Sequence, residues 1–440
     1  MLVEFSVANY LSFKDKVTLS MVAADIEELQ ENRIQTDDPE WHILKSAAIY
    51  GANASGKSNL IKAMAFMKRF VLNSSRETQY GDYIIKERFK FSTETENKPS
   101  SFEISFISGA IRYTYGFDVD NSRVHREWLY SYPDDEETIL FNREQDNIEI
   151  VNFEEGKGLE DKTRSNALFL SVAAQFNGKI AKNIFDWFAI FKFITGLDDE
   201  DTLPYTLDQL DDATRKDIIL DLLNWADLQI KEVRKIDFEA MLSDVSSELS
   251  KLSSKITDEI PNLSNEMTKE HKKLIEAHKQ VKIKHKHALN MFTYHALYDA
   301  DNNEVGTEEM PLLSESEGTR KILSLAGLIV DTLLDGKILV IDEMDARLHP
   351  NITSYIVKLF NRNKTNAQLI IATHDTNLLN NRLYRRDQVW FTEKDRYGAT
   401  ALYSLAEFKL TGDESYEKDY RSGRYGAIPF IGGNISSLIK

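Results

Sequence analysis

The sequence predicts an α/β fold organised around a phosphate-binding loop, and three observations lead to this class. The first is a complete G-x-x-x-x-G-K-S motif, Gly51-Ala52-Asn53-Ala54-Ser55-Gly56-Lys57-Ser58. The second is its setting, because the small apolar run 46–50 precedes it and residues 59–67 follow with helical periodicity. The third is a pair of apolar runs, 337–343 and 368–375, that end in polar side chains, as buried parallel strands do.

The phosphate-binding motif predicts how a nucleotide is held. A loop between a strand and a helix turns free N–H groups and the positive end of the helix dipole toward phosphates. Gly51 and Gly56 let the backbone approach the ligand without a Cβ. We expect Lys57 to reach the β- and γ-phosphates of ATP and the Ser58 hydroxyl to bind Mg²⁺. The remaining residues expected to contact the nucleotide are Asn53, Ala54, Ser55 and Asn59.

Length and composition bound the other classes. The 440 residues suggest two to three domains, and the absence of cysteine excludes disulfides and cysteine-based metal sites. The N-terminus lacks the layout of a signal peptide and no apolar run is long enough for a bilayer, so we expect a cytoplasmic protein without a membrane partner. The net charge of −17 argues against a surface covered with nucleic-acid contacts, although a local basic patch stays open.

The chain in order predicts a hairpin, then strands, then helices. Residues 2–19 are expected to form two short strands of an ordinary edge hairpin. Alternating or aromatic runs predict strands at 89–92, 101–107, 112–117, 127–132 and 148–151. Helical spacing of apolar residues predicts helices over 166–194 and about 207–230.

A polar stretch follows, over residues 239–278, with leucines at helical spacing and a proline break, which predicts a short helical hairpin. Residues 279–287 then alternate, with Lys282, Lys284 and Lys286 on one face. A solvated strand face is the favoured interpretation, and a contact with nucleic acid or an acidic partner is the alternative. Five histidines lie nearby, but without cysteine or close carboxylates they do not indicate a metal site.

The second half of the site follows the two C-terminal apolar runs. Asp342 suits a position in the Mg²⁺ shell, which is filled by oxygen ligands. Glu343 suits the role of orienting and polarising the attacking water. His374 follows the next strand, and because parallel strands end at one edge of a sheet, we expect it to contact the γ-phosphate.

A second anion-binding device is predicted upstream of residues 338–343. Ser316 and Gly318 precede a helix expected over 321–334, whose N-terminus favours anions. One protomer needs only one phosphate cradle. The second is therefore expected to serve the nucleotide of another protomer.

As a set, these motifs resemble the ABC/SMC-type head ATPases. Within them, the chain is most similar to the RecF- and OLD-like AAA-type ATPases of prokaryotic defence and abortive-infection operons, such as the RloA group and the ATPase subunit of the PARIS anti-phage system. Residues 7–13 and 424–430 also resemble that group. Two features depart from related patterns: the signature lacks the double glycine of transporters, and the stretch after His374 is too short for the nuclease domain of OLD proteins.

The resemblance implies a P-loop NTPase of ABC/SMC head type with an inserted β-rich lobe and a helical lid or hairpin. The expected divisions are the N-terminal half of the head at 1–80, the β-rich lobe at 81–165, the helical lid and hairpin at 166–300, and the C-terminal half of the head at 301–440. Lys57, Ser58, Asp342, Glu343 and His374 would act in cis, and Ser316, Gly318 and Asp345 across a homo-oligomer of heads.

The implied function is ATP hydrolysis by a sensor or regulatory subunit in anti-phage defence. Such a subunit would answer to a phage-derived trigger and control a separate toxic effector, with a nuclease as the expected effector. The alternative is a RecF/SMC-like DNA-binding clamp in DNA repair, and a transporter ATPase subunit is a third candidate. Nucleic acid stays open as a partner, although the composition does not indicate it.

Overall fold

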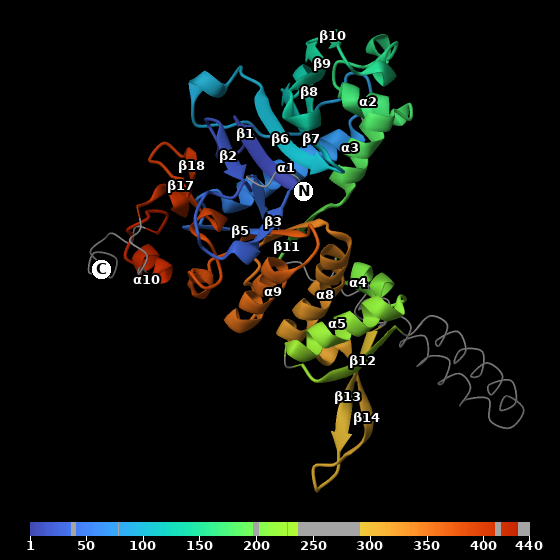
Figure 1. Cartoon of the computed structure of the whole chain (residues 1–440), viewed down its shortest axis with the longest axis vertical. Coiled ribbons are helices and arrows are strands. Elements are labelled where there is room, and N and C mark those ends of the chain that lie inside the picture. The colour runs from blue at the N-terminus through green and yellow to red at the C-terminus, as the bar shows by residue number, and fades with distance from the viewer. Residues whose placement is uncertain are drawn as a thin grey trace, which may run out of the picture. The chain divides into compact units, whose positions relative to one another are not determined.

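The computed structural model describes residues 1–36, 41–77, 79–196, 202–226, 228–235, 291–409 and 415–429 (Figure 1). The chain forms two compact units, one made of Met1–Gly196 with Thr332–Lys440 and the other of Leu197–Asp331. Helix α8 (Glu317–Asp335) begins in the second unit and ends in the first. In the described parts of the chain, no helix is both long enough and apolar enough to cross a membrane.

A six-stranded sheet carries the predicted motifs of the first unit, in the order β11-β15-β16-β5-β17-β18. All neighbours run parallel except the last pair, β17 and β18. The strands are β5 (Ser46–Gly51), β11 (Phe191–Thr195), β15 (Ile338–Asp342), β16 (Gln368–Ala372), β17 (Val389–Lys394) and β18 (Thr400–Ser404). This sheet confirms the predicted α/β class. The carboxyl ends of β5, β15 and β16 meet at one edge, as parallel neighbours must.

Helix α1 (Lys57–Asn73) packs between this sheet and a seven-stranded antiparallel sheet (Figure 1). The order of the second sheet is β10-β9-β8-β7-β6-β1-β2. Phe66 and Phe70 of α1 pack against Phe102 and Phe117 of this sheet, with ring centroids 4.9 and 5.4 Å apart. Its strands are β1 (Leu2–Ala8), β2 (Val17–Ser20), β6 (Ser100–Ser108), β7 (Ile111–Val119), β8 (Val124–Tyr132), β9 (Thr138–Glu144) and β10 (Asn147–Ile150). The expected N-terminal hairpin is present. Of its two strands, only β2 lies at an edge of the sheet, because β1 lies between β2 and β6.

The remaining elements of the first unit are short or peripheral. They are β3 (Arg33–Gln35), β4 (His42–Leu44), α2 (Phe169–Gln175), α3 (Lys179–Ala189), α9 (Pro350–Arg362) and α10 (Tyr416–Arg421). Pro350 is the first residue of α9. A backbone N–H at this position would have no acceptor within the helix, so a proline, which lacks the N–H, removes no helical hydrogen bond.

Three of the predicted elements are wrong or too long. Residues 89–92 form no strand, because the Phe89 N–H donates to Asn9 Oδ1 at 3.1 Å and its carbonyl accepts from Thr95 Oγ1 at 3.0 Å. The helix expected over 166–194 ends early: Asn177 with φ +65° separates α2 from α3, and the last apolar residues form β11 beside β15.

The helix expected at 207–230 is also divided. It is α4 (Leu203–Gln209) and α5 (Ala213–Trp225), and Ile230 opens a strand instead. Asp212 begins α5, since its carboxylate accepts from the Arg215 N–H at 2.9 Å.

The second unit combines α4 and α5 with a three-stranded antiparallel sheet, in the order β12-β13-β14, and with most of α8. The strands are β12 (Ile230–Lys235), β13 (Met291–Tyr298) and β14 (Glu304–Pro311). Asp331 of α8 accepts from the Tyr205 hydroxyl at 2.5 Å and pairs with Arg215 at 2.7 Å, which joins the three helices. The helical hairpin predicted at 239–278 and the basic strand predicted at 279–287 lie outside the described residues.

Candidate functional site

The phosphate-binding loop joins the end of β5 to the start of α1, as its sequence predicts. A Cβ on Gly51 would lie 2.4 Å from Ser55 Oγ and 2.5 Å from the Thr392 carbonyl oxygen. Gly56 has φ +123°, and a Cβ there would lie 2.6 Å from Thr400 Oγ1. Both glycines are therefore required by space, and the loop is wrapped as tightly as a phosphate cradle needs.

Hydroxyl groups from distant parts of the chain hold this loop in shape. Ser55 Oγ lies 2.6 Å from Thr392 Oγ1, and the Thr400 hydroxyl donates to the Ser55 carbonyl at 2.7 Å. Ser12 Oγ lies 2.8 Å from Thr400 Oγ1 and accepts from Asn59 Nδ2 at 2.8 Å. The Asn59 side chain, which the sequence predicts to contact the nucleotide, thus makes a hydrogen bond within the protein. Sequence reasoning missed Ser12, Thr392 and Thr400, since nothing near them in the sequence points to the loop.

The other predicted loop residues lie at its tip. Asn53 and Ala54 are exposed, and Ala54 has φ +61°, the left-handed conformation that turns the loop.

Lys57 connects the loop to the acids that follow β15. Its side chain is only 6% exposed, and Nζ donates to the Gly51 carbonyl at 2.8 Å. Burial lowers the pKa of Lys57, while the carboxylates of Asp342, Asp345 and Glu343 act in the opposite direction. The ammonium and the three acids therefore lie in one electrostatic neighbourhood.

Asp342 is the last residue of β15, and its Oδ1 atom is buried without a hydrogen-bond partner in the described residues. A buried carboxylate oxygen without a partner is costly, about 1–3 kcal/mol or more. Ser58, in the first turn of α1, offers a partly buried hydroxyl. Carboxylate and hydroxyl oxygens are the donors that Mg²⁺ prefers, so these two residues fit the ion.

Glu343 has an unusual backbone. Its φ is +53°, in the left-handed region where a residue with a side chain is strained by about 1–3 kcal/mol. Among the described residues, no hydrogen bond engages its carboxylate, which leaves both oxygens available to a water molecule. Strain of this kind is often kept at functional sites, where it fixes the direction of a side chain.

Asp345 links the ends of β15 and β16. Its Oδ1 accepts from the Thr373 hydroxyl at 2.6 Å and from the His374 N–H at 3.2 Å. The sequence predicts that Asp345 acts across a dimer, and nothing in its local pattern indicates these bonds within its own chain.

His374 follows β16 at the same edge, and its side chain is exposed. The pKa of His374 is lowered, mostly by desolvation and to a smaller extent by the nearby Lys57 ammonium. The carboxylates of Asp345, Glu343 and Asp342 act in the opposite direction. A neutral imidazole near pH 7 is therefore expected, with one ring N–H to donate.

Ser316 and Gly318 belong to the second unit. The exposed Ser316 caps α8, because its Oγ accepts from the Thr319 N–H at 3.1 Å, and Gly318 lies in the first turn. The structure thus brings Lys57, Asp342, Glu343, Asp345 and His374 together within the first unit, beside Ser58.

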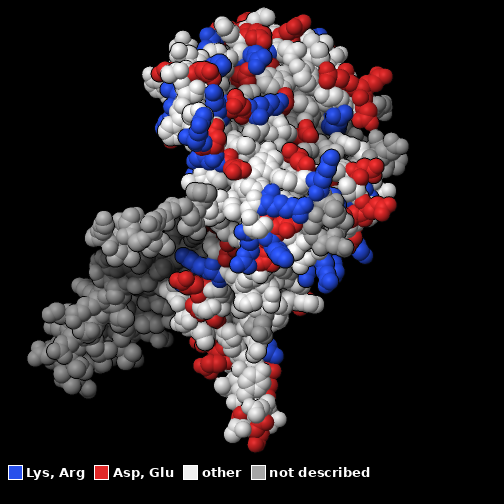
Figure 2. All heavy atoms as spheres, turned by 90° about the vertical axis from the view of Figure 1, so that its left-hand side faces the viewer, with Lys and Arg blue, Asp and Glu red and all other residues white. Residues whose placement is uncertain are grey.

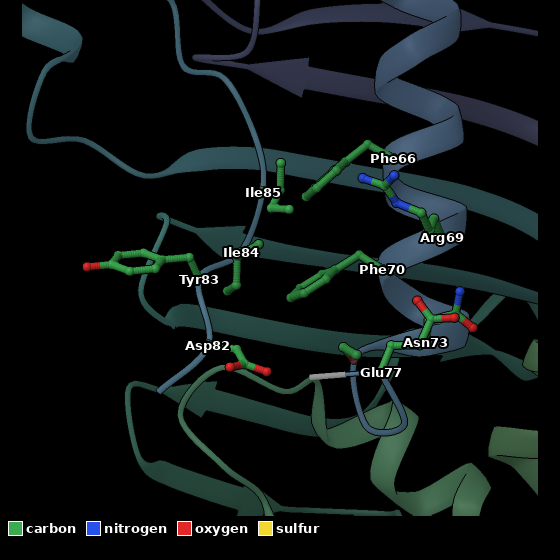
Figure 3. A pocket seen from close by; sticks show the side chains of 10 residues that line it. Phe66, Arg69, Phe70, Asn73, Glu77, Asp82, Tyr83, Ile84 and Ile85 are labelled. Atoms are coloured by element: carbon green, nitrogen blue, oxygen red, sulfur yellow. The ribbon is translucent and has the colours of Figure 1, made fainter. Parts of the chain in front are cut away.

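A separate hollow of about 530 Å³ lies along the C-terminal half of α1 (Figure 3). Phe66 and Phe70 line it on the helix, Ile84 and Ile85 line it on an extended segment, and the ring of the neighbouring Tyr83 points away from the helix. It begins more than two helical turns after Lys57, so it is distinct from the phosphate loop.

Charges on the surface are mixed. Figure 2 shows Lys and Arg side chains interspersed with Asp and Glu over the face that it presents. Together with the net charge of −17, this surface gives no particular support to a nucleic-acid partner.

The chain was compared with protein families, curated proteins and solved structures. A sequence profile of the family described as "AAA domain, putative AbiEii toxin, Type IV TA system" matches residues 46–380. No curated protein matches the chain. Among solved structures, the SMC head domain from Thermotoga maritima is similar over 93% of this chain and 99% of its own, with 12% identity and a TM-score of 0.41. An SmcHead bound to the C-winged helix domain of ScpA is similar over 92% of this chain and 97% of its own, with 12% identity and a TM-score of 0.40.

Proposed function

The chain belongs to this AAA domain family, and from that premise we propose that it hydrolyses ATP as a regulatory subunit of an anti-phage defence system. The observation that carries the proposal is the meeting of Lys57, Asp342 and Glu343 at one edge of the sheet. When bound, Mg²⁺ would supply a Lewis acid that neutralises charge on the phosphates.

The residues of the chain divide the work of hydrolysis. Lys57 exchanges the Gly51 carbonyl for the β- and γ-phosphate oxygens, and Ser58 and Asp342 are the residues that would hold the ion. Glu343 orients a water molecule and accepts its proton as the water attacks the γ-phosphorus and the bond to ADP breaks. His374 donates a hydrogen bond to the γ-phosphate, where charge is stabilised in the transition state.

The active form is a homo-oligomer in which heads share nucleotides. Support comes from the exposed N-terminus of α8, where Ser316 and Gly318 offer a second anion-binding helix end in addition to the one at Lys57. Two such ends in one chain suit a nucleotide held between the phosphate loop of one protomer and the α8 N-terminus of its partner.

Mixing two inactive variants tests this sharing. Ser316→Arg should bind nucleotide but not hydrolyse it, and Lys57→Ala should lack the cradle. In a mixture, each protein supplies the half that the other lacks, so we expect turnover to recover to about a quarter of the wild-type rate per site on random pairing. If both variants are folded and associate, yet the mixture stays inactive in a phosphate-release assay, the sites are not shared.

The toxic activity belongs to another chain, and a nuclease is the expected effector. The sequence has no cysteine nucleophile, and the adjacent acids at the end of β15, Asp342 and Glu343, are already assigned to ATP. The family description names a putative toxin and a type IV TA system, which supports membership of such a system. The RloA group and the ATPase subunit of PARIS are the defence ATPases whose roles fit. A phage-derived signal would shift the nucleotide-dependent state and release or activate the effector.

The test is protection against phage by this chain with and without its neighbouring gene. Wild type together with the neighbour should protect, whereas wild type alone should not. Glu343→Gln with the neighbour should lose the regulated response, because the nucleotide cycle cannot be completed. Full protection by this chain alone would contradict a separate effector.

A further inference from the structure

Gly196 is buried at the end of β11, where the chain leaves the first unit. Strands β11 and β15 pair in register up to Thr195 and Asp342. One residue further, the Gly196 N–H donates to the Asp342 carbonyl at 2.6 Å. This bond brings the glycine directly against the peptide that joins Asp342 to Glu343.

The space beside Gly196 is filled by the backbone of the acidic pair. A Cβ on Gly196 would lie 1.9 Å from the Glu343 carbonyl oxygen, 2.7 Å from its carbonyl carbon and 3.0 Å from the Asp342 carbonyl oxygen. All three atoms are main chain, so no side-chain rotation could relieve the contact. The φ of Gly196 lies outside the left-handed region, so glycine is needed here for space alone.

The Glu343 carbonyl has little freedom to retreat. It accepts from the Ala346 N–H at 3.1 Å, which closes the turn that leads to Asp345. On the following residue, the Met344 N–H donates to the Ala372 carbonyl of β16 at 3.2 Å. The peptide after Glu343 is thus held between β11 on one side and β16 on the other.

We propose that Gly196 is a positioning residue for Glu343. Its lack of a side chain lets the end of β11 approach closely enough to hold Glu343 in its left-handed conformation, and that conformation sets where the carboxylate meets the attacking water. The inference rests on the proposed role of Glu343 in ATP hydrolysis.

The test compares Gly196→Ala with Gly306→Ala in the full-length chain. Gly306 lies in the exposed strand β14, and a Cβ added there would have no other atom within 4 Å, so it is the matched control. We expect Gly196→Ala to lower kcat about 100-fold, because a displacement of about 1 Å at a reacting group can have that effect. The Kd for ATP, measured with Mg²⁺ by calorimetry, should stay within about threefold of wild type, since Lys57 and its loop are untouched.

The Gly196→Ala variant tests the positioning role of Gly196, and the Glu343→Gln variant tests ATP hydrolysis itself. An unchanged kcat in Gly196→Ala would overturn the inference, and so would loss of ATP binding together with turnover, because the glycine would then be only structural. Binding stoichiometry in each preparation gives the folded fraction to which kcat is normalised. Glu343→Gln in the same series tests the proposed function separately: a wild-type rate that does not depend on Glu343 would refute that function, whatever Gly196→Ala does.

Discussion

Replacing Lys57 with alanine is expected to reduce ATP turnover by about 100- to 1,000-fold and to weaken nucleotide binding. The side chain is buried, and its ammonium is held beside the phosphate cradle by the Gly51 carbonyl. Catalysis of phosphoryl transfer depends mostly on charge stabilisation, and no other described cation is built into this loop. Phosphate release and the affinity for a fluorescent ATP analogue measure the two effects.

The control for this variant is Lys62→Ala. Lys62 lies on the same helix, about one and a half turns further on, but its side chain is exposed. Removing it leaves the cradle intact, so turnover should match wild type. If Lys57→Ala retained turnover within about twofold of wild type, the phosphate loop would not be the catalytic site.

Replacing Glu343 with glutamine should give a different defect. The amide keeps the shape of the side chain but cannot accept a proton, so kcat should fall by about 100- to 10,000-fold while ATP still binds. Because hydrolysis ends the bound state, we expect nucleotide to be retained and protomers to stay associated. Nucleotide retention after desalting and oligomer mass by light scattering measure this state.

Glu136→Gln is the matched control, since Glu136 is exposed and its carboxylate makes no hydrogen bond or ion pair within the described residues. It should hydrolyse and release nucleotide as wild type does. Rapid release of nucleotide from Glu343→Gln, at the wild-type rate, would remove Glu343 from the catalytic role.

The sequence was sufficient to predict the sheet edge that carries the site. Parallel strands buried on both faces are continuous apolar runs, so β15 and β16 stand out, and Asp342, Glu343 and His374 lie at or just after the ends of these strands. The G-x-x-x-x-G-K-S spacing identifies the loop because each of its residues has a local task.

Other parts of the site depend on contacts between residues far apart in the chain. The apolar residues of β11 continue the pattern of the helix before them, and only their pairing with β15 makes them a strand. Gly196 looks like an ordinary loop glycine until the Glu343 carbonyl is placed against it. The hydrogen bonds from Asp345 to Thr373 and from Thr400 to Ser55 are of the same kind, since no local spacing encodes them.

The position of β5 in its sheet has a consequence for synthesis on the ribosome. Its neighbours are β16 and β17: Leu369 of β16 pairs with Ser46, and the Thr392 hydroxyl of β17 donates to the Tyr50 carbonyl, a bond that spans 342 residues. At translation rates of about 5–20 residues per second, this apolar strand emerges roughly 20–70 seconds before its second neighbour exists. The nascent chain therefore has no finished nucleotide site until residue 392 has been made, and during that interval β5 is a natural segment for a chaperone to cover.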